Sequence, residues 1–575
     1  SGTRIDGIQG ATHISPDVGL TVADVPGVVT AVGARQFWMQ DPSPDTDPAT
    51  SEGITVFTST APTVAVGDSV TVGGSVNEFR PGGTGGTTNL TTTEIVTPTV
   101  TVVAHDVALP AATLVGPGGR VPPSTVIEND ASGSVETSGV FDPANDGIDF
   151  WESMEGMRVQ IDNAEVVGPT NSFGETPVVP AGSSVRTNRG GIVLQSNDTN
   201  PERVVVDNTL AATPTANVGD TLTGATVGVL DYGFGNFMLE VTATPTLHSG
   251  GLAREITRAP RANELAVATF NVENLSPADP QTKFDRLGAT VVTNLAAPDL
   301  IAVEEIQDND GPTDDGVVAA DQTLSRLAAA IQAAGGPAYS WRQIDPVNDQ
   351  DGGQPGGNIR VAFMFRTDRG LSFVDRPGGG STTATQVVVT AGKPHLSSSP
   401  GRVDPTNAAW NASRKPLAGE FTFGGHTLFV IANHFVAKLG DQPLFGQFQP
   451  PVNSSETQRH QQATVVHGFI DQILAADPSA DVITLGDLND FDFSQTANIL
   501  VGTGGMVDLP RTLPLAERYS YDFEGNSEVL DQILISDHLA EPSGVTAFDY
   551  DVVHVNSEFA DQVSDHDPQV VRLTM

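Results

Sequence analysis

The pattern of apolar residues changes near residue 264, and this change divides the chain into two kinds of structure. After it, predicted strands over 265–270 and 300–303 alternate with predicted helices over 283–295 and 321–334. Such alternation is typical of a sheet covered by helices. Before it, short alternating runs lie between glycine, proline and aspartate turns, as in small barrels or sandwiches. The chain therefore predicts β-rich modules followed by one layered α/β domain.

Three domains follow from this division. We expect a β-rich domain at 1–108, a second at 109–258 and the α/β domain at 262–575. The order of short strands in the first block resembles that of an oligonucleotide-binding (OB) barrel. Because Val218-Gly219-Asp220 repeats Val66-Gly67-Asp68, and a strand pattern follows each, we predict that the second block is a diverged copy of the first.

Two roles for the first block stay open. OB barrels often bind single strands through aromatic side chains and a basic groove. The first block has few aromatic residues, and its basic residues are only Arg4, Arg35 and Arg80. A packing or spacer role is therefore favoured, and nucleic-acid binding is kept as the alternative.

Charge and cysteine content exclude several classes of protein. The 575 residues include 70 acidic and 28 basic side chains, a formal net charge of −42, and no cysteine. Such a chain repels a polyanion at long range, which disfavours a passive nucleic-acid binder, whereas carboxylates suit Mg²⁺ and Ca²⁺. Disulfides, thiol nucleophiles and cysteine metal sites are excluded. No apolar run is long enough for a membrane span. The composition is typical of secreted bacterial proteins, with an acidic cytosolic protein as the alternative.

Five short polar motifs lie at the ends of predicted strands in the α/β domain. They are Asn271 after the first strand, Glu304-Glu305 after the second, His434 after a third, Asp487-Leu488-Asn489 after a fourth, and Asp565-His566 before the last. Each alone has a structural explanation, because an acidic residue after a strand often caps a helix and Gly-Asp-x-Asn is a common turn composition. Their combination instead predicts one site that contains carboxylates, amides and two histidines.

This set of motifs resembles the endonuclease/exonuclease/phosphatase superfamily over residues 262–575. The resemblance implies a DNase I-like four-layer α/β sandwich, in which two sheets pack face to face with helices outside. With its β-rich blocks in front, the whole chain resembles bacterial extracellular nucleases of the ExeM/NucH type. The implied fold class is α+β, with OB-like barrels preceding the DNase I-like domain.

The resemblance also implies a role for each matched residue. Asn271, Glu305 and Asp565 are expected to bind Mg²⁺ or Mn²⁺, and Glu304 is the less favoured member of its pair. The expected catalytic residues are His434, Asp487, Asn489, Asp531 and His566. Among these, Asp487 and Asn489 would position water and phosphate, and Asp531 would orient His566. Arg414 is expected to bind the substrate phosphate.

Some positions leave alternatives open or depart from the family pattern. The sequence offers no visible carboxylate partner for His434. Arg360 is expected either to contact phosphate or to form a structural salt bridge. The acidic loop that holds Asp308, Asp310 and Asp314 lacks the EF-hand spacing, and it is interpreted either as a structural Ca²⁺ site or as a solvated loop.

The expected function is that of a secreted or cell-surface bacterial nuclease that hydrolyses phosphodiester bonds of DNA, with RNA as a further candidate substrate. This reaction needs an in-line water, neutralised phosphoryl charge and a proton for the leaving oxygen. One rival is another phosphoesterase of this fold, acting on nucleotides, inositol phosphates or lipid head groups. The other is a cell-surface binding protein with a degenerate enzyme domain. We expect a monomer without a stable protein partner.

Overall fold

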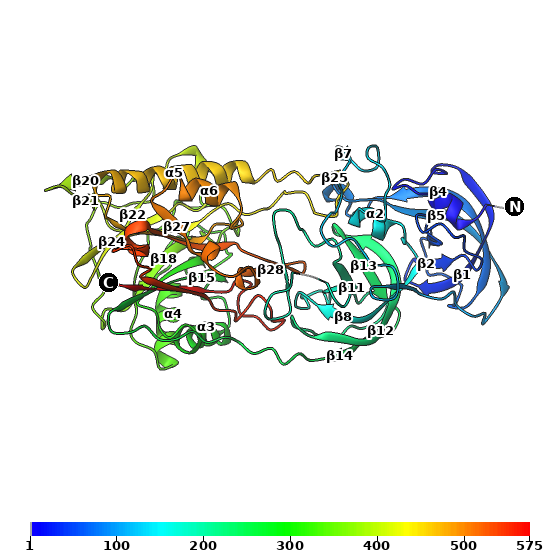
Figure 1. Cartoon of the computed structure of the whole chain (residues 1–575), viewed down its shortest axis with the longest axis horizontal. Helices are drawn as coiled ribbons and strands as arrows, with labels where there is room; N and C mark the ends of the chain where they lie inside the picture. The colour runs from blue at the N-terminus through cyan, green and yellow to red at the C-terminus, as the bar shows by residue number, and fades with distance from the viewer. Residues whose placement is uncertain (1–2, 184) are drawn as a thin grey trace. The chain divides into compact units, whose positions relative to one another are not determined.

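Two compact units make up the chain in the computed structural model, which describes residues 3–183 and 185–575 (Figure 1). Unit 1 contains the residues up to Leu252 together with Gly440–Ser454 and Phe523–Ser527, and unit 2 contains the rest. The domain predicted at 262–575 therefore includes two short segments that belong to unit 1. Among the described residues, no helix is both long and apolar enough to cross a membrane.

Side-chain packing explains why these two segments join unit 1. Phe445 is buried, its ring centroid lies 5.7 Å from that of Phe237, and its carbonyl accepts a hydrogen bond of 2.7 Å from the Tyr232 hydroxyl. In the second segment, the Asn526 side chain accepts a hydrogen bond of 2.7 Å from Asn200. Both segments lie in loops, where no periodic pattern reveals which core a single side chain enters.

Unit 1 begins with a closed five-stranded barrel. Its elements are α1 (Ile5–Gln9), β1 (Thr21–Val32), β2 (Gln36–Gln40), β3 (Gly53–Phe57), β4 (Ser69–Phe79), the turn η1 (Gly83–Gly85) and β5 (Thr92–Ala104). The strands pair in the order β1-β2-β3-β5-β4, and β4 closes the ring against β1. Only the pair β3–β5 is parallel. Alternate side chains such as Val29, Met39, Ile54 and Ile95 fill the interior.

The second block contains a ring with the same connectivity. Its elements are β6 (Thr113–Val115), β7 (Gly133–Ser134), α2 (Gly147–Glu152), β8 (Arg158–Val166), β9 (Thr176–Val179), β10 (Ile192–Val193), β11 (Val204–Asp207), β12 (Thr221–Gly233), β13 (Asn236–Val241) and β14 (Thr246–His248). The ring runs β8-β9-β11-β13-β12 and back to β8, and its one parallel pair is β11–β13. A short strand, β25 (Phe448–Gln449), pairs with β7.

The repeated Val-Gly-Asp sequence forms the same turn in both rings. Gly67 and Gly219 have φ angles of 90° and 85°, in the left-handed region that favours glycine. In each turn the aspartate carboxylate accepts the backbone N–H three residues before it, at 2.9 Å for Asp68 and 2.8 Å for Asp220. The sequence match thus corresponds to an equivalent structural position in two rings of equal strand order.

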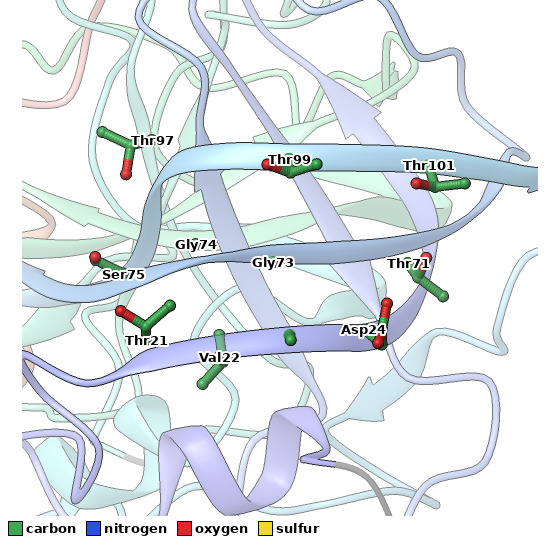
Figure 2. A pocket seen from close by; sticks show the side chains of 11 residues that line it. Thr21, Val22, Asp24, Thr71, Gly73, Gly74, Ser75, Thr97, Thr99 and Thr101 are labelled. Carbon is green, nitrogen blue, oxygen red and sulfur yellow. The ribbon is translucent and has the colours of Figure 1, made fainter.

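A polar groove of about 400 Å³ crosses β1, β4 and β5 of the first barrel (Figure 2). Hydroxyl groups line it, including those of Thr21, Thr71, Ser75 and Thr99, and its only charged side chain is Asp24. The groove therefore lacks the aromatic and basic groups on which single-stranded nucleic acids are bound. Two of the few aromatic side chains of this block, Phe37 and Trp38, are buried and cannot stack on bases.

Unit 2 contains two large sheets and their covering helices. Its elements are β15 (Glu264–Leu275), α3 (Gln281–Ala289), the π-helical turn η2 (Thr290–Asn294), β16 (Leu300–Ile306), α4 (Asp321–Ala333), β17 (Ser340–Arg342), β18 (Arg360–Phe365), β19 (Ser372–Phe373), β20 (Val387–Thr390), β21 (Lys393–Leu396), β22 (Gly401–Arg402), η3 (Ala408–Trp410), β23 (Leu417–Phe423), β24 (His426–His434), α5 (Glu456–Ala476), β26 (Asp481–Asp487), α6 (Gln495–Val501), β27 (Met506–Asp508), η4 (Leu509–Thr512), η5 (Leu515–Glu517), β30 (Asp531–Ser536), α7 (Asp537–Ala540), β31 (Phe548–Val552) and β32 (Gln569–Thr574). The strands β28 (Tyr521–Phe523) and β29 (Asn526–Glu528) overlap the two ends of the second inserted segment.

The layers of unit 2 follow from where its apolar side chains are buried. One sheet has the order β17-β18-β16-β15-β32-β31, and the other β19-β23-β24-β26-β30-β27 with β22 beside β23. A core that includes Val267, Phe363, Val430 and Ile533 joins their inner faces. The outer face of the first sheet packs on α3 and α4, and that of the second on α5 and α6 (Figure 1). The helices expected at 283–295 and 321–334 are confirmed.

The ion pair between Arg258 and Glu264, at the start of β15, is expected to stabilise unit 2 in a pH-dependent way. Arg258 donates hydrogen bonds of 2.8 and 2.9 Å to the buried Glu264 carboxylate, and these bonds lower the pKa of Glu264 to about 2. A carboxyl group whose pKa is lower in the folded state stabilises the fold above its unfolded pKa, and this contribution is lost as the pH falls toward 2. We expect Arg258→Ala to lower the free energy of unfolding at pH 7 by about 2 kcal/mol. The deficit should shrink between pH 4.5 and pH 3 in urea titrations, and a constant deficit would contradict the assignment.

Candidate active site

Strand pairing brings together the motifs that lie between Asn271 and His566 in the sequence. In the parallel pair β24–β26, His434 lies opposite Asp487, and in the antiparallel pair β26–β30, Asp487 lies opposite Asp531. Asn271 in β15 donates hydrogen bonds of 3.0 Å both to Asp487 and to Glu305 in β16. This amide therefore connects the ends of the two sheets.

Glu305, His434 and Asp487 form a group that could hold a metal ion. One ligand atom from each lies within 4.8 Å of the others. His434 Nε2 is 3.5 Å from Asp487 Oδ2 and 3.9 Å from Glu305 Oε1. Burial raises the pKa of both carboxyl groups, that of Asp487 to about 6, and Asp565 raises that of Glu305 further. A divalent cation would relieve this cost, so the residues fit the metal that the family pattern implies.

His566 and Asp531 form a buried pair beside this group. His566 Nδ1 lies 2.7 Å from Asp531 Oδ2, and the same oxygen accepts a hydrogen bond of 2.8 Å from Ser520. Burial opposes protonation of His566, yet Asp531, Asp487 and Asp565 together raise its pKa well above the usual value. This shift favours the imidazolium form, and the ring Nε2 is 3.6 Å from Asp487.

His434 has the opposite electrostatic character. Burial lowers its pKa well below the usual value, and the positive charges of Arg414 and His566 lower it further. Its Nδ1 has no hydrogen-bond partner among the residues that the structure describes. His434 is therefore neutral while His566 is charged.

The remaining predicted site residues, Asp565, Asn489 and Asn271, make hydrogen bonds or close contacts around this group. Asp565 Oδ1 is 3.8 Å from His566 Nε2, and its Oδ2 is 3.4 Å from the Tyr521 hydroxyl. Asn489 has a φ of 48° and donates to the Phe435 carbonyl at 2.9 Å. In Asn271 the amide nitrogen faces the carboxylates while its oxygen accepts the Glu273 N–H, so its role as a metal ligand stays a prediction.

The two predicted phosphate-binding arginines have different surroundings. Arg414 is buried and donates to the Phe435 carbonyl at 2.9 Å; burial lowers its pKa, although Glu305 and Asp487 oppose this shift. Arg360 is also buried, and it bonds Asp345 at 2.8 Å and the Asn358 carbonyl at 3.0 Å. The environment of Arg360 matches the salt-bridge alternative.

Adjacent glutamates near the end of β16 reach different environments. Glu305 has a φ of 62°, a left-handed conformation that non-glycine residues adopt mainly where the surroundings enforce it, and it faces the metal group. Glu304 is fully buried and accepts a hydrogen bond of 2.5 Å from Thr269. Burial raises the pKa of Glu304 well above the usual value, so this side chain is a neutral acid.

Three residues that the sequence analysis did not predict also border the site: Glu273, Ser520 and Tyr521. Burial and the charge of Asp565 raise the pKa of Glu273 to about 7, and the Tyr521 ring lies 4.8 Å from that of His566. Ser520 supports Asp531 as described above. The position of Glu273, two residues after Asn271 in an extended segment, is a signal that could have identified it. Tyr521 begins the three-residue strand β28 and Ser520 directly precedes it, and so short an element shows no such pattern.

The acidic loop after Glu305 is held by its own hydrogen bonds. Asp308 accepts the Asn358 amide at 2.9 Å and the Asp310 N–H at 3.2 Å. Interaction with Asp349 raises the pKa of Asp314. Within the described ranges, these aspartates do not form one of the groups whose ligand atoms converge to metal-binding distance. Ca²⁺ binding at Asp308, Asp310 and Asp314 stays a prediction.

Comparison with family models identifies this domain. The model described as the endonuclease/exonuclease/phosphatase family matches residues 268–566, which is more than half of the chain. The chain belongs to this family. Members of the endonuclease/exonuclease/phosphatase family hydrolyse phosphoester bonds and usually use a divalent metal such as Mg²⁺. A second model, a domain of unknown function (DUF8508), matches residues 114–249 and thus the second ring.

Several solved structures are similar to part of the chain, whereas no curated protein matches it. Truncated TDP2 from Caenorhabditis elegans is 16% identical, with a TM-score of 0.34 over 54% of this chain and 98% of that one. TDP2 from D. rerio, in complex with a single-strand DNA product, is 18% identical, with a TM-score of 0.34 over 54% and 99%. The Bacteroides thetaiotaomicron mannosyl-6-phosphatase Bt3783 is 16% identical, with a TM-score of 0.33 over 54% and 100%.

Proposed function

We propose that the protein is a metal-dependent phosphodiesterase that cleaves DNA with little sequence preference. The observation that carries this proposal is the convergence, in one buried cluster, of the metal-capable group Glu305, His434 and Asp487 with the His566–Asp531 pair. Phosphodiester hydrolysis needs both a cation site and a proton donor, and this cluster offers both. A binding protein with a degenerate enzyme domain would not be expected to retain all five side chains.

The two histidines and Asp487 suggest how the reaction proceeds. Groups whose pKa values are pushed apart can divide acid and base roles between them. The imidazolium of His566, oriented by Asp531, would donate a hydrogen bond to a phosphoryl oxygen and give its proton to the leaving oxygen as the phosphoester bond breaks. Asp487, whose carboxyl pKa is about 6, would accept a proton from the attacking water near neutral pH. Neutral His434 would orient the phosphate from the opposite side.

The metal contribution is limited to charge and position. When bound at Glu305, with Asp565 as the further predicted ligand, Mg²⁺ or Mn²⁺ would act as a Lewis acid on the phosphoryl oxygen and leave Asp487 free to take the proton of the water. Arg414 interacts electrostatically with Glu305 and Asp487, and its positive charge would favour an anionic substrate at the site.

For the two rings of unit 1 we propose OB-like barrels with a packing or spacer role. Their support is the equal strand order and the single parallel pair at the same point of each ring. The buried Phe37 and Trp38 count against base stacking. We also propose that the protein acts outside the bacterial cell or at its surface; its acidic composition, with 70 acidic and 28 basic residues, supports this.

Metal removal and a substrate panel test the proposed function. Incubation with EDTA is expected to abolish plasmid cleavage, and excess Mg²⁺ or Mn²⁺ should restore it. A diester, bis(p-nitrophenyl) phosphate, should be hydrolysed, whereas the monoester p-nitrophenyl phosphate should react far more slowly. Circular DNA, linear DNA, RNA and sphingomyelin are assayed in parallel. Diester hydrolysis with intact DNA would overturn DNA as the substrate, and cleavage that resists EDTA would overturn the metal requirement.

A further inference from the structure

Three carboxylates converge in the second β-rich block, outside the phosphoesterase domain. Glu128 and Asp130 lie in the loop after β6, and Asp146 directly precedes α2. One oxygen from each lies within 4.8 Å of the others. Backbone hydrogen bonds hold the two segments together, because the N–H groups of residues 147 and 148 donate to the carbonyls of 126 and 127 at 2.9 and 3.0 Å.

Asp146 is the unusual member of this group. Its side chain is 1% exposed, and neither carboxylate oxygen has a hydrogen-bond partner among the described residues. An aspartate at the position before a helix normally accepts an N–H of the first turn, yet Asp146 makes no such bond. A buried carboxylate with both oxygens unsatisfied is costly, and native structures contain few of them. Its oxygens are directed to Glu128 and Asp130 instead.

The surrounding charge does not compensate Asp146. Burial, followed by the charges of Glu128, Asp149, Asp130 and Asp142, raises the pKa of Asp146 to about 7. The nearby cation His13 is engaged by Asp149 at 2.6 Å and by Glu152 at 3.6 Å. The neighbouring carboxylates therefore disfavour the charged form of Asp146, and no hydrogen bond among the described residues offsets this.

We propose that Glu128, Asp130 and Asp146 bind a divalent cation of the Ca²⁺ type. Existing hydrogen bonds use only Oε1 of Glu128 and Oδ1 of Asp130, which leaves one oxygen of each, and both of Asp146, for the ion. Ca²⁺ takes six to eight oxygen ligands in flexible geometry, including water. The ion would fasten the loop at 128–130 to the start of α2, independently of the phosphoesterase site.

Calcium binding to the full-length chain tests this proposal. Equilibrium dialysis should find one Ca²⁺ fewer per chain in Asp146→Asn than in the wild type, or binding at this site weakened at least about tenfold. The matched control is Asp162→Asn, which removes an exposed carboxylate of the same block and should bind as the wild type does. Glu128→Gln is a second variant, expected to behave as Asp146→Asn does.

Thermal unfolding gives a readout that a purely structural role would not produce. In Ca²⁺-free buffer Asp146→Asn should melt at or above the wild-type temperature, because it removes an unpaired buried charge. Added Ca²⁺ should raise the melting temperature of the wild type and of Asp162→Asn, but not of Asp146→Asn. Equal stoichiometry and an equal Ca²⁺-induced shift in all variants would overturn the site. Equal stabilisation by Mg²⁺ at the same concentration would overturn the assignment to Ca²⁺.

Discussion

Glu305→Gln is expected to reduce phosphodiester hydrolysis about a thousandfold, whereas Glu304→Gln should leave it close to the wild-type rate. Glu305 belongs to the metal-capable group, and the loss of a Lewis acid removes several kcal/mol of transition-state stabilisation. Glu304 is fully buried, bonds Thr269 and is held neutral by its raised pKa. Glutamine is therefore a neutral isostere of the form in which Glu304 already exists.

Glu304→Gln serves as the matched control for Glu305→Gln. Both variants replace the same residue type by the same amide, one position apart on the same strand. The measurement is kcat/KM on bis(p-nitrophenyl) phosphate at saturating Mg²⁺, together with a melting curve for each variant. We expect Glu304→Gln to be at least as stable as the wild type, because one of its buried oxygens has no partner among the described residues. Equal losses of activity in both variants would refute the assignment of Glu305 to the metal.

Asp531→Asn is expected to reduce kcat at least about a hundredfold and to move the alkaline limb of the pH profile to lower pH. The Asp531 carboxylate lies 2.7 Å from His566 Nδ1 and is the main charge that raises the pKa of this histidine. A raised pKa keeps the imidazolium present to higher pH, so removal of the charge lets His566 lose its proton earlier. The removal of such a partner disturbs both charge and orientation of the ring.

The pH–rate profile and a milder variant separate this role from a structural one. Ser520→Ala removes a hydrogen bond of 2.8 Å to Asp531 but leaves the carboxylate charge in place. It should therefore lower kcat only several-fold and leave the alkaline limb where it is in the wild type. An alkaline limb that does not move in Asp531→Asn would contradict a protonated His566 in the reaction.

The sequence predicts the elements and motifs of unit 2 well for a physical reason. A buried strand is a continuous apolar run, and a polar residue at its end stands out against it. Thus Asn271, His434 and Asp487 are recognisable, and the strands that carry them are confirmed as β15, β24 and β26. The same reasoning cannot find Tyr521 or Ser520, because the strand β28 has only three residues and gives no periodic background against which a polar residue would be noticed.

The sequence alone determined the change from β-rich blocks to alternating strands and helices, the Val-Gly-Asp repeat and the types of residue at the site. Only the tertiary structure decided that burial raises the pKa of Glu304 well above its usual value, and that Asp146 is a buried carboxylate without a hydrogen-bond partner among the described residues. Local patterns depend on neighbours along the chain, and the sequence carries them directly. The charge state of a carboxyl group depends instead on burial and on neighbours from distant segments, which exist only once the chain has folded.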